Sequence, residues 1–362
     1  TAAAYQLPGI LTKPAGVSNR IHAVLGFPPG SVRIQDMKFD LAALSATLKG
    51  VIPLDRGGRL RLNIRTGALP IEQMAPYVPR LKPYEPSGKI RLNLGARGGA
   101  GAETLRWRGR ISVADAAFRP PAGLKPVRDL NGALVLTGTG LAGDDLSARL
   151  GRTPISASLR LDDWENPTLR VGLRAPRLDL ADAGLTHPRR DVSLRDVDLK
   201  ADYRNDAWQI RNLSATLNQT TLRAQGVIQE KPEPRADLVL SFPFLDIDGM
   251  APLAEIEGGG WTEQSGPRLW TVVLKAESGR NKALTFSNLS ARIRYQNDRI
   301  DITDGEVDLF GGKAQAEGRI DLRQEGRPAY DARFSLTGAD AEQATTALEM
   351  PDGFVTGTFS LG

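Results

Sequence analysis

The chain has 362 residues and carries 47 Lys and Arg against 42 Asp and Glu, a formal net charge of +5. This small excess is spread along the chain and only 6% of the residues are aromatic, which does not favour nucleic-acid binding. Cysteine is absent and there are two histidines, which excludes disulfides, a thiol nucleophile and thiolate metal sites. No apolar run approaches the roughly 18 residues of a membrane-spanning helix.

Apolar and polar residues alternate with a period of two along most of the chain. Successive side chains of a strand point to opposite faces, so each such segment has one apolar and one polar face. In chain order the segments are 60–64, 90–94, 105–108, 155–161, 169–173, 197–203, 289–295 and 314–322. Between them, 38 Gly and 24 Pro mark turns. The pattern predicts an antiparallel all-β fold with a few short helices.

Four twelve-residue segments align without a gap, each with apolar residues at its third and fifth positions. They are 60–71, 169–180, 236–247 and 330–341. Each segment ends 30 residues after a particular leucine in three cases and 32 residues after it in the fourth. A glycine or a leucine follows each of these leucines by nine residues. These pairs are Leu41 and Gly50, Leu150 and Leu159, Leu217 and Gly226, and Leu309 and Gly318. The constant offset predicts a repeat array.

The repeat unit is predicted as a strand, a turn, two further strands and a short helical segment. The helical segments are expected over 71–78, 178–185, 247–253 and 340–349, the last with Asp340 as a helix N-cap. The predicted organisation is a first repeat at 1–71, an insertion of two strand pairs at 72–131, and repeats at 132–190, 191–256 and 257–362. The chain starts at Thr1 and stops within the pattern, so we expect a longer protein in which the last repeat continues.

One set of apolar positions shares the same parity in all four aligned segments. Its members are Leu60, Leu62, Ile64, Leu169, Val171, Leu173, Leu238, Leu240, Phe242, Ala332, Phe334 and Leu336. Four short helices cannot cover the face that these residues form. The face therefore lines either an open groove that takes acyl chains or the core of a closed two-sheet sandwich, and the pattern suits both.

Other motifs favour turns over chemistry. The string Gly138-Thr-Gly-Leu-Ala-Gly143 matches a dinucleotide-binding loop, but residues 144–150 read as a strand where that site needs a helix. Asp246, Asp248, Asp301 and Asp304 suggest calcium loops but lack the later ligands of such loops, and Asp is common in turns. We expect no catalytic residues, no metal and no cofactor.

Residues 307–322, VDLFGGKAQAEGRIDL, together with the strand and helix expected after them, resemble the C-terminal signature of the AsmA-like family. Residues 130–138, LNGALVLTG, are similar to a repeating strand of that family, the AsmA/TamB/YhdP superfamily of bridge-like lipid-transfer proteins. The resemblance implies an elongated, twisted, open β groove that carries phospholipid between the inner and outer membranes. It also implies a periplasmic body with an inner-membrane anchor outside this chain, and no enzyme activity.

Two alternatives stay open at this stage. One is a structural scaffold that assists outer-membrane protein assembly by pairing its sheet edges with client strands. The other is a β binding module with a closed core. An open apolar trough distinguishes lipid transfer from both.

Overall fold

The computed structural model describes residues 5–7, 11–13, 18–42, 44–55, 57–74, 76–99, 105–120, 124–164, 166–254, 256–258, 269–323, 329–347 and 357–361. By its internal contacts the chain divides into two compact units, Thr1–Val171 and Gly172–Gly362. The division falls within strand β13 (Thr168–Asp179). Each unit is built on an open, twisted and mostly antiparallel sheet, so the predicted all-β fold with a few short helices is confirmed.

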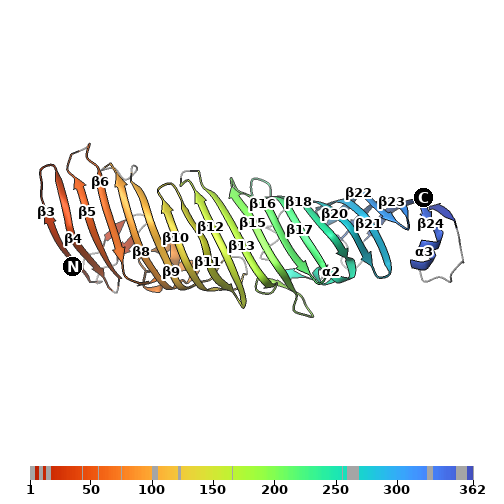
Figure 1. Ribbon diagram of the computed structural model, residues 1–362, viewed down its shortest axis with the longest axis horizontal. Helices are drawn as coiled ribbons and strands as arrows, with labels where there is room; N and C mark the ends of the chain where they lie inside the picture. The colour runs from red at the N-terminus through yellow and green to blue at the C-terminus, as the bar shows by residue number, and fades with distance from the viewer. Residues whose placement is uncertain are drawn as a thin grey trace. The chain divides into compact units, whose positions relative to one another are not determined.

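The sheet of the first unit consists of long strands that pair largely in chain order. Its strands are β3 (Asn19–Gly26), β4 (Ser31–Leu41), β5 (Leu44–Pro53), β6 (Leu60–Thr66), β7 (Leu69–Pro70), β8 (Ser87–Gly98), β9 (Arg106–Phe118), β10 (Val127–Thr137), β11 (Leu141–Leu150) and β12 (Thr153–Asp162). β6 pairs with β8, and the short helices α1 (Ile71–Met74) and η1 (Pro79–Tyr84) lie in the connection between them (Figure 1). A separate pair, β1 (Tyr5–Leu7) and β2 (Leu11–Lys13), precedes the sheet.

The second unit has the same construction. Its strands are β15 (Ser193–Arg204), β16 (Ala207–Leu217), β17 (Thr220–Gln229), β18 (Arg235–Asp246), β20 (Leu269–Asn281), β21 (Leu284–Gln296), β22 (Arg299–Leu309), β23 (Gly312–Asp321), β24 (Ala329–Asp340) and β25 (Thr358–Leu361). Helix α2 (Ile247–Ala254) follows β18, and α3 (Ala341–Ala347) follows β24. Two short strands, β14 (Leu185–Thr186) and β19 (Glu257–Gly258), pair with each other.

The structure gives the predicted repeat a physical form. Each of the four leucines ends a strand (β4, β11, β16 or β22), and the next strand begins three residues later, after a two-residue turn. The register then places Gly50 opposite Leu62, Gly226 opposite Leu238, and Gly318 opposite Ala332. The third position of the twelve-residue segment thus has an equivalent cross-strand neighbour in three repeats. The exact repeat boundaries stay predictions.

The predicted helical segments are partly right. α2 and α3 form where expected, and Asp340 caps α3 because its Oδ1 accepts hydrogen bonds from the backbone N–H groups of Glu342 and Gln343. α1 stops at Met74, within the predicted 71–78, and residues 348–349 lie outside the described part of the chain. The helix predicted over 178–185 is wrong: β13 runs through Asp179, and hydrogen-bonded turns follow up to Gly184.

Two further expectations need correction. β18 and β20 pair in parallel, although the period-two pattern predicts antiparallel strands throughout. A parallel neighbour requires a crossover connection, which α2 and the residues after it supply. The described residues of 72–131 form one strand pair, β8 and β9, and the start of β10, where two pairs are predicted.

β-bulges interrupt the ladders at residues with a left-handed backbone conformation. Asp129, Asp196, Asn288 and Asp304 have φ between 51° and 53°, and each lies at a register shift between neighbouring strands. Asp and Asn tolerate this conformation better than other non-glycine residues. Such bulges increase the local right-handed twist, which lets long strands of this sheet coil.

Candidate functional site

The predicted apolar positions on β6 lie on one face of the first unit's sheet. Leu60, Leu62 and Ile64 are half-buried, and the residues between them, such as Arg61 and Asn63, are exposed. In a strand this alternation assigns the two sets to opposite faces. We call the side that carries Leu62 the apolar face of the first unit and the opposite side its polar face.

The register extends the apolar face across many strands. One row runs through Ile34, Gly50, Leu62, Ala96 and Trp107 on β4, β5, β6, β8 and β9. The next row runs through Met37, Leu48, Ile64, Leu94, Gly109 and Leu136, from β4 to β10. Cross-strand partners share a face, so these rows make the apolar face continuous within the unit.

Most side chains of these rows are only half-buried. Ile34 and Ala96 are buried, but Leu48, Ile64 and Leu94 keep part of their surface accessible. At the first strand the face is more open, with Ile21 56% and Leu25 42% exposed. Beside this sheet, the described residues of the first unit form only the β1–β2 pair and two short helices. The closed two-sheet sandwich is therefore not found in this part of the chain.

The second predicted group lies on β13. Leu169, Val171 and Leu173 are half-buried and alternate with exposed Arg170 and Arg174. The two arginines pair with carboxylates: Arg170 Nη2 lies 3.0 Å from Asp162 and Arg174 Nε lies 3.2 Å from Asp198. In the structure, the apolar residues of β13 therefore lie on one face and the arginines on the other, as the alternation predicts.

The third and fourth groups divide between core and surface. Leu238 and Leu240 are half-buried, while Phe242 is 5% exposed in a core cluster with Ala276 and Phe286. Ala332 and Phe334 are exposed, Phe334 by 49%, whereas Leu336 is 3% exposed in a cluster with Ala314 and Ala339. Phe242 and Leu336 thus pack inside the protein, and the other members present accessible apolar surface.

Helix α2 covers one end of the side of the second unit's sheet that carries Phe242. Met250 packs against the Phe242 cluster and also against a cluster of Leu180, Val192 and Leu217. In Figure 1 α2 follows the end of β18, next to β20. The helix therefore covers the strand ends and leaves Leu238, near the other end of β18, without this cover.

The aspartates that suggested calcium loops have structural partners. Asp246 caps α2 through a hydrogen bond from the Gly249 N–H, and its carboxylate accepts one from Arg280 Nη2 at 2.6 Å. These contacts, led by the Arg280 hydrogen bond, hold the pKa of Asp246 below its ordinary value. Asp301 and Asp304 pair with arginines in the same way. No group of three or more His, Asp or Glu suited to a metal ion occurs among the described residues.

The glycine-rich string forms a hairpin. Residues 138–140 connect β10 to β11, and β11 begins at Leu141 where a dinucleotide site requires a helix. The structure thus offers no helix N-terminus for a pyrophosphate at this position.

Sequence reasoning missed the part of the apolar face that β5, β8 and β9 contribute. The partners on β5, β8 and β9, such as Leu48, Leu92, Leu94 and Ile111, lie outside the four aligned segments. The alternation of residues 90–94 carried the signal, but parity alone does not say which strands become neighbours.

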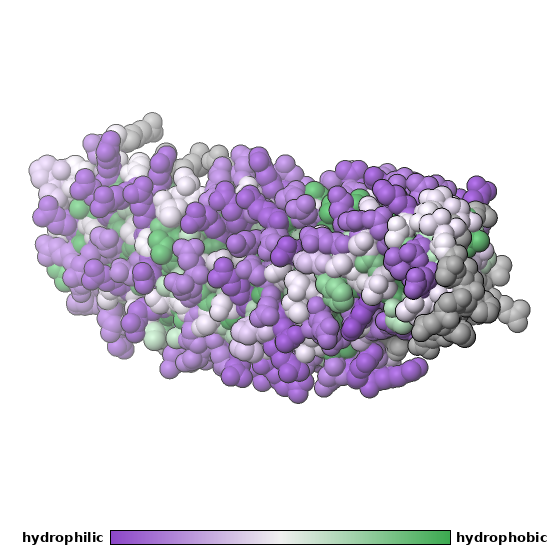
Figure 2. Space-filling view, turned by 45° about the vertical axis from the view of Figure 1, so that its right-hand side comes forward, coloured by the Kyte–Doolittle hydropathy of each residue, from purple (hydrophilic) through white to green (hydrophobic). Residues whose placement is uncertain are grey.

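Figure 2 shows one side of the surface, where hydrophilic side chains dominate and hydrophobic ones lie between them. No helix among the described residues is long and apolar enough to cross a membrane. No family model, no curated protein and no solved structure matches the chain.

Proposed function

We propose that this protein is a non-enzymatic lipid-transfer conduit whose apolar face carries acyl chains. The observation that supports it is the continuous row structure of the first unit, in which side chains such as Leu48, Ile64 and Leu94 stay half-exposed. A contiguous exposed apolar surface of this kind marks a site for a ligand or partner. Extended alkyl chains fit a face that is rich in Leu, Ile, Val and Ala.

The energetics favour such a path. Burial of one methylene group contributes about 0.8 kcal/mol, so a 16-carbon chain in water costs roughly 12 kcal/mol relative to an apolar site. A continuous apolar face removes most of this cost at every point, so a lipid can move along it with small changes in free energy. Without the two-residue β7, the sheet of the first unit has nine strands, which at about 4.8 Å per strand give a path of roughly 40 Å.

The resemblance to the AsmA-like family supplies the cellular part of the proposal. The cargo is phospholipid or another acyl-chain lipid, and the transfer runs between the inner and outer membranes. The protein then acts in the periplasm, with an inner-membrane anchor outside this chain and membranes at the ends of the full-length protein.

The direct test is lipid extraction and native mass spectrometry of the purified chain, followed by site-specific crosslinking. A photoreactive benzophenone amino acid at Leu62 reports on the apolar face. The matched control is Lys38 on β4, which is exposed and lies opposite Thr47 on the polar face. We expect crosslinked phospholipid at Leu62 and none at Lys38. No copurifying lipid, or equal crosslinking at both positions, contradicts the proposal.

A further inference from the structure

The polar face of the first unit contains a depression of about 720 Å³ over β6, β8, β9 and β10. Its walls carry four arginines and two asparagines: Arg97, Arg106, Arg108, Arg110, Asn63 and Asn93. None of the described residues that line it is a carboxylate. Leu94, Gly95, Gly109 and Val135 complete the lining, so its charged groups are all cations and its neutral polar side chains are all amides.

The register brings these cations close together. Arg106 lies directly opposite Arg97, and Arg108 and Arg110 follow at alternate positions of β9. Neighbouring strands are about 4.8 Å apart and alternate residues of one strand about 6.7 Å. Arg108 lies opposite Gly95, which has no side chain to fill the space between the arginines. Like charges placed opposite one another destabilise a sheet, so this arrangement has a cost that the fold itself does not require.

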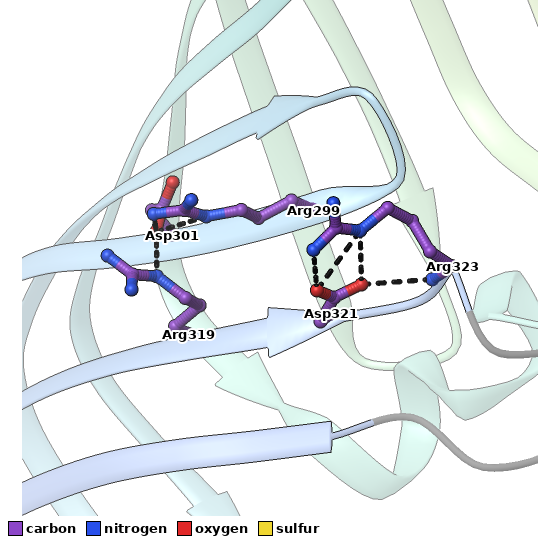
Figure 3. Close-up of polar contacts among 5 residues, drawn as sticks. All are labelled: Arg299, Asp301, Arg319, Asp321 and Arg323. Atoms are coloured by element: carbon purple, nitrogen blue, oxygen red, sulfur yellow. Dashed lines mark hydrogen bonds and ion pairs between the residues drawn. The ribbon is translucent and has the colours of Figure 1, made fainter.

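Several arginines of the second unit pair with carboxylates. In the second unit Asp301 accepts hydrogen bonds from both Arg299 and Arg319, and Asp321 binds Arg323 (Figure 3). By contrast, Arg97, Arg106, Arg108 and Arg110 form no ion pair with any residue that the structure describes. Among the residues that the structure describes, no carboxylate neutralises the positive charge of the depression.

We infer that this depression binds a phosphate-bearing anion and prefers two adjacent phosphate groups. Guanidinium groups bind phosphate oxygens through two parallel hydrogen bonds, and the spacing along β9 suits two phosphates. The side-chain amides of Asn63 and Asn93 add neutral donors. The arginine and asparagine side chains of the site lie on the face opposite Leu62 and Ile64, while Leu94 and Gly109 of the apolar rows border it.

The lining disfavours single-stranded nucleic acid. Such ligands bind by stacking their bases on aromatic side chains. The aromatic residue of this region, Trp107, lies between Arg106 and Arg108 in the sequence and so points to the apolar face, opposite Ala96. A compact diphosphate or a diphosphorylated lipid headgroup remains the chemistry that fits.

The test measures binding of inorganic pyrophosphate by calorimetry and cosedimentation with vesicles of phosphatidylcholine, with and without cardiolipin. The variant is R106Q/R108Q, and the matched control is R319Q, which removes an arginine that already has a carboxylate partner. We expect at least a tenfold loss of binding in the double variant and less than a twofold change in the control. The double variant should melt at or above the wild-type temperature, because like-charge repulsion is relieved.

Pyrophosphate binding without cosedimentation on cardiolipin vesicles assigns the site to soluble diphosphates, and cosedimentation that depends on cardiolipin and is lost in R106Q/R108Q assigns it to a headgroup. Absence of both, an unchanged affinity in R106Q/R108Q, or tighter binding of poly(dT) than of either ligand overturns the inference. The apolar-face variant I64D should bind pyrophosphate normally, so failure of this site and failure of the lipid conduit give different results.

Discussion

Replacing Ile64 with Asp tests whether the apolar face is open. Ile64 lies between Leu48 and Leu94 in its row and is half-buried. Full burial of an isoleucine side chain contributes about 1.5–3 kcal/mol, so a half-buried one contributes about 1 kcal/mol. At an open face the new carboxylate reaches water, and we expect a total loss of about 1–2 kcal/mol. A sealed core that buries an unpaired charge loses about 3–5 kcal/mol.

Thermal unfolding and lipid crosslinking, measured together, decide between these cases. For a unit of this size 1 kcal/mol corresponds to about 2–4 °C, so Ile64→Asp should lower the melting temperature by roughly 2–8 °C. The same variant should lose crosslinking to a photoactivatable phospholipid, because a charge obstructs acyl chains. The control Thr47→Asp places the charge opposite Arg65 on the polar face and should change neither property. Unfolding of Ile64→Asp at room temperature, or unchanged crosslinking, refutes the open-face model.

Three further predictions concern the fold. Arg323→Gln should raise the pKa of Asp321 from about 2 towards its ordinary value of 3.8, since the Arg323 hydrogen bond is the main cause of the depression; an NMR titration checks this. Asp246→Asn should lower the melting temperature near pH 7, because it removes the partner of Arg280 and the cap of α2. The difference from wild type should shrink as the pH falls below about 4 through the depressed native pKa of Asp246, because protonation removes the same charge in the wild type. Gly50→Val should lower the unfolding free energy in urea by about 1–3 kcal/mol, because a Cβ there overlaps the backbone of β6.

Much of the fold follows from local pattern. Period-two alternation locates strands because the pleat assigns each residue to a face, and the segments at 60–64 and 90–94 became β6 and β8. The leucine and glycine spacing predicted the repeat because a strand, a two-residue turn and a second strand have fixed lengths. α2 and α3 begin at the ends of twelve-residue segments because the strands before them also have fixed lengths.

The remaining features depend on contacts that no local pattern encodes. The turns after Asp179 replace a helix because the segment is short and the Asp179 carboxylate accepts a hydrogen bond from the Ala181 N–H, a contact that favours a turn. The parallel pairing of β18 with β20 depends on where the chain returns after α2. Bulges such as the one at Asp304 are invisible in sequence because aspartate is equally common in ordinary turns. For the candidate site, the face on which each residue lies was predictable. Which strands pair with one another, and which elements pack over them, were not.

The alternation that creates the apolar face also creates the arginine-lined depression. On β9, Trp107 and Ile111 belong to one face, while Arg106, Arg108 and Arg110 belong to the other. Because one strand supplies both surfaces, a one-residue slip in register would exchange them, so selection on either face constrains the other. Substitutions at alternate positions nevertheless separate the two surfaces experimentally. Two independent sites require a specific pattern of defects. Substitutions at Trp107 or Ile111 should impair lipid binding alone, and substitutions at Arg106, Arg108 or Arg110 should impair phosphate binding alone.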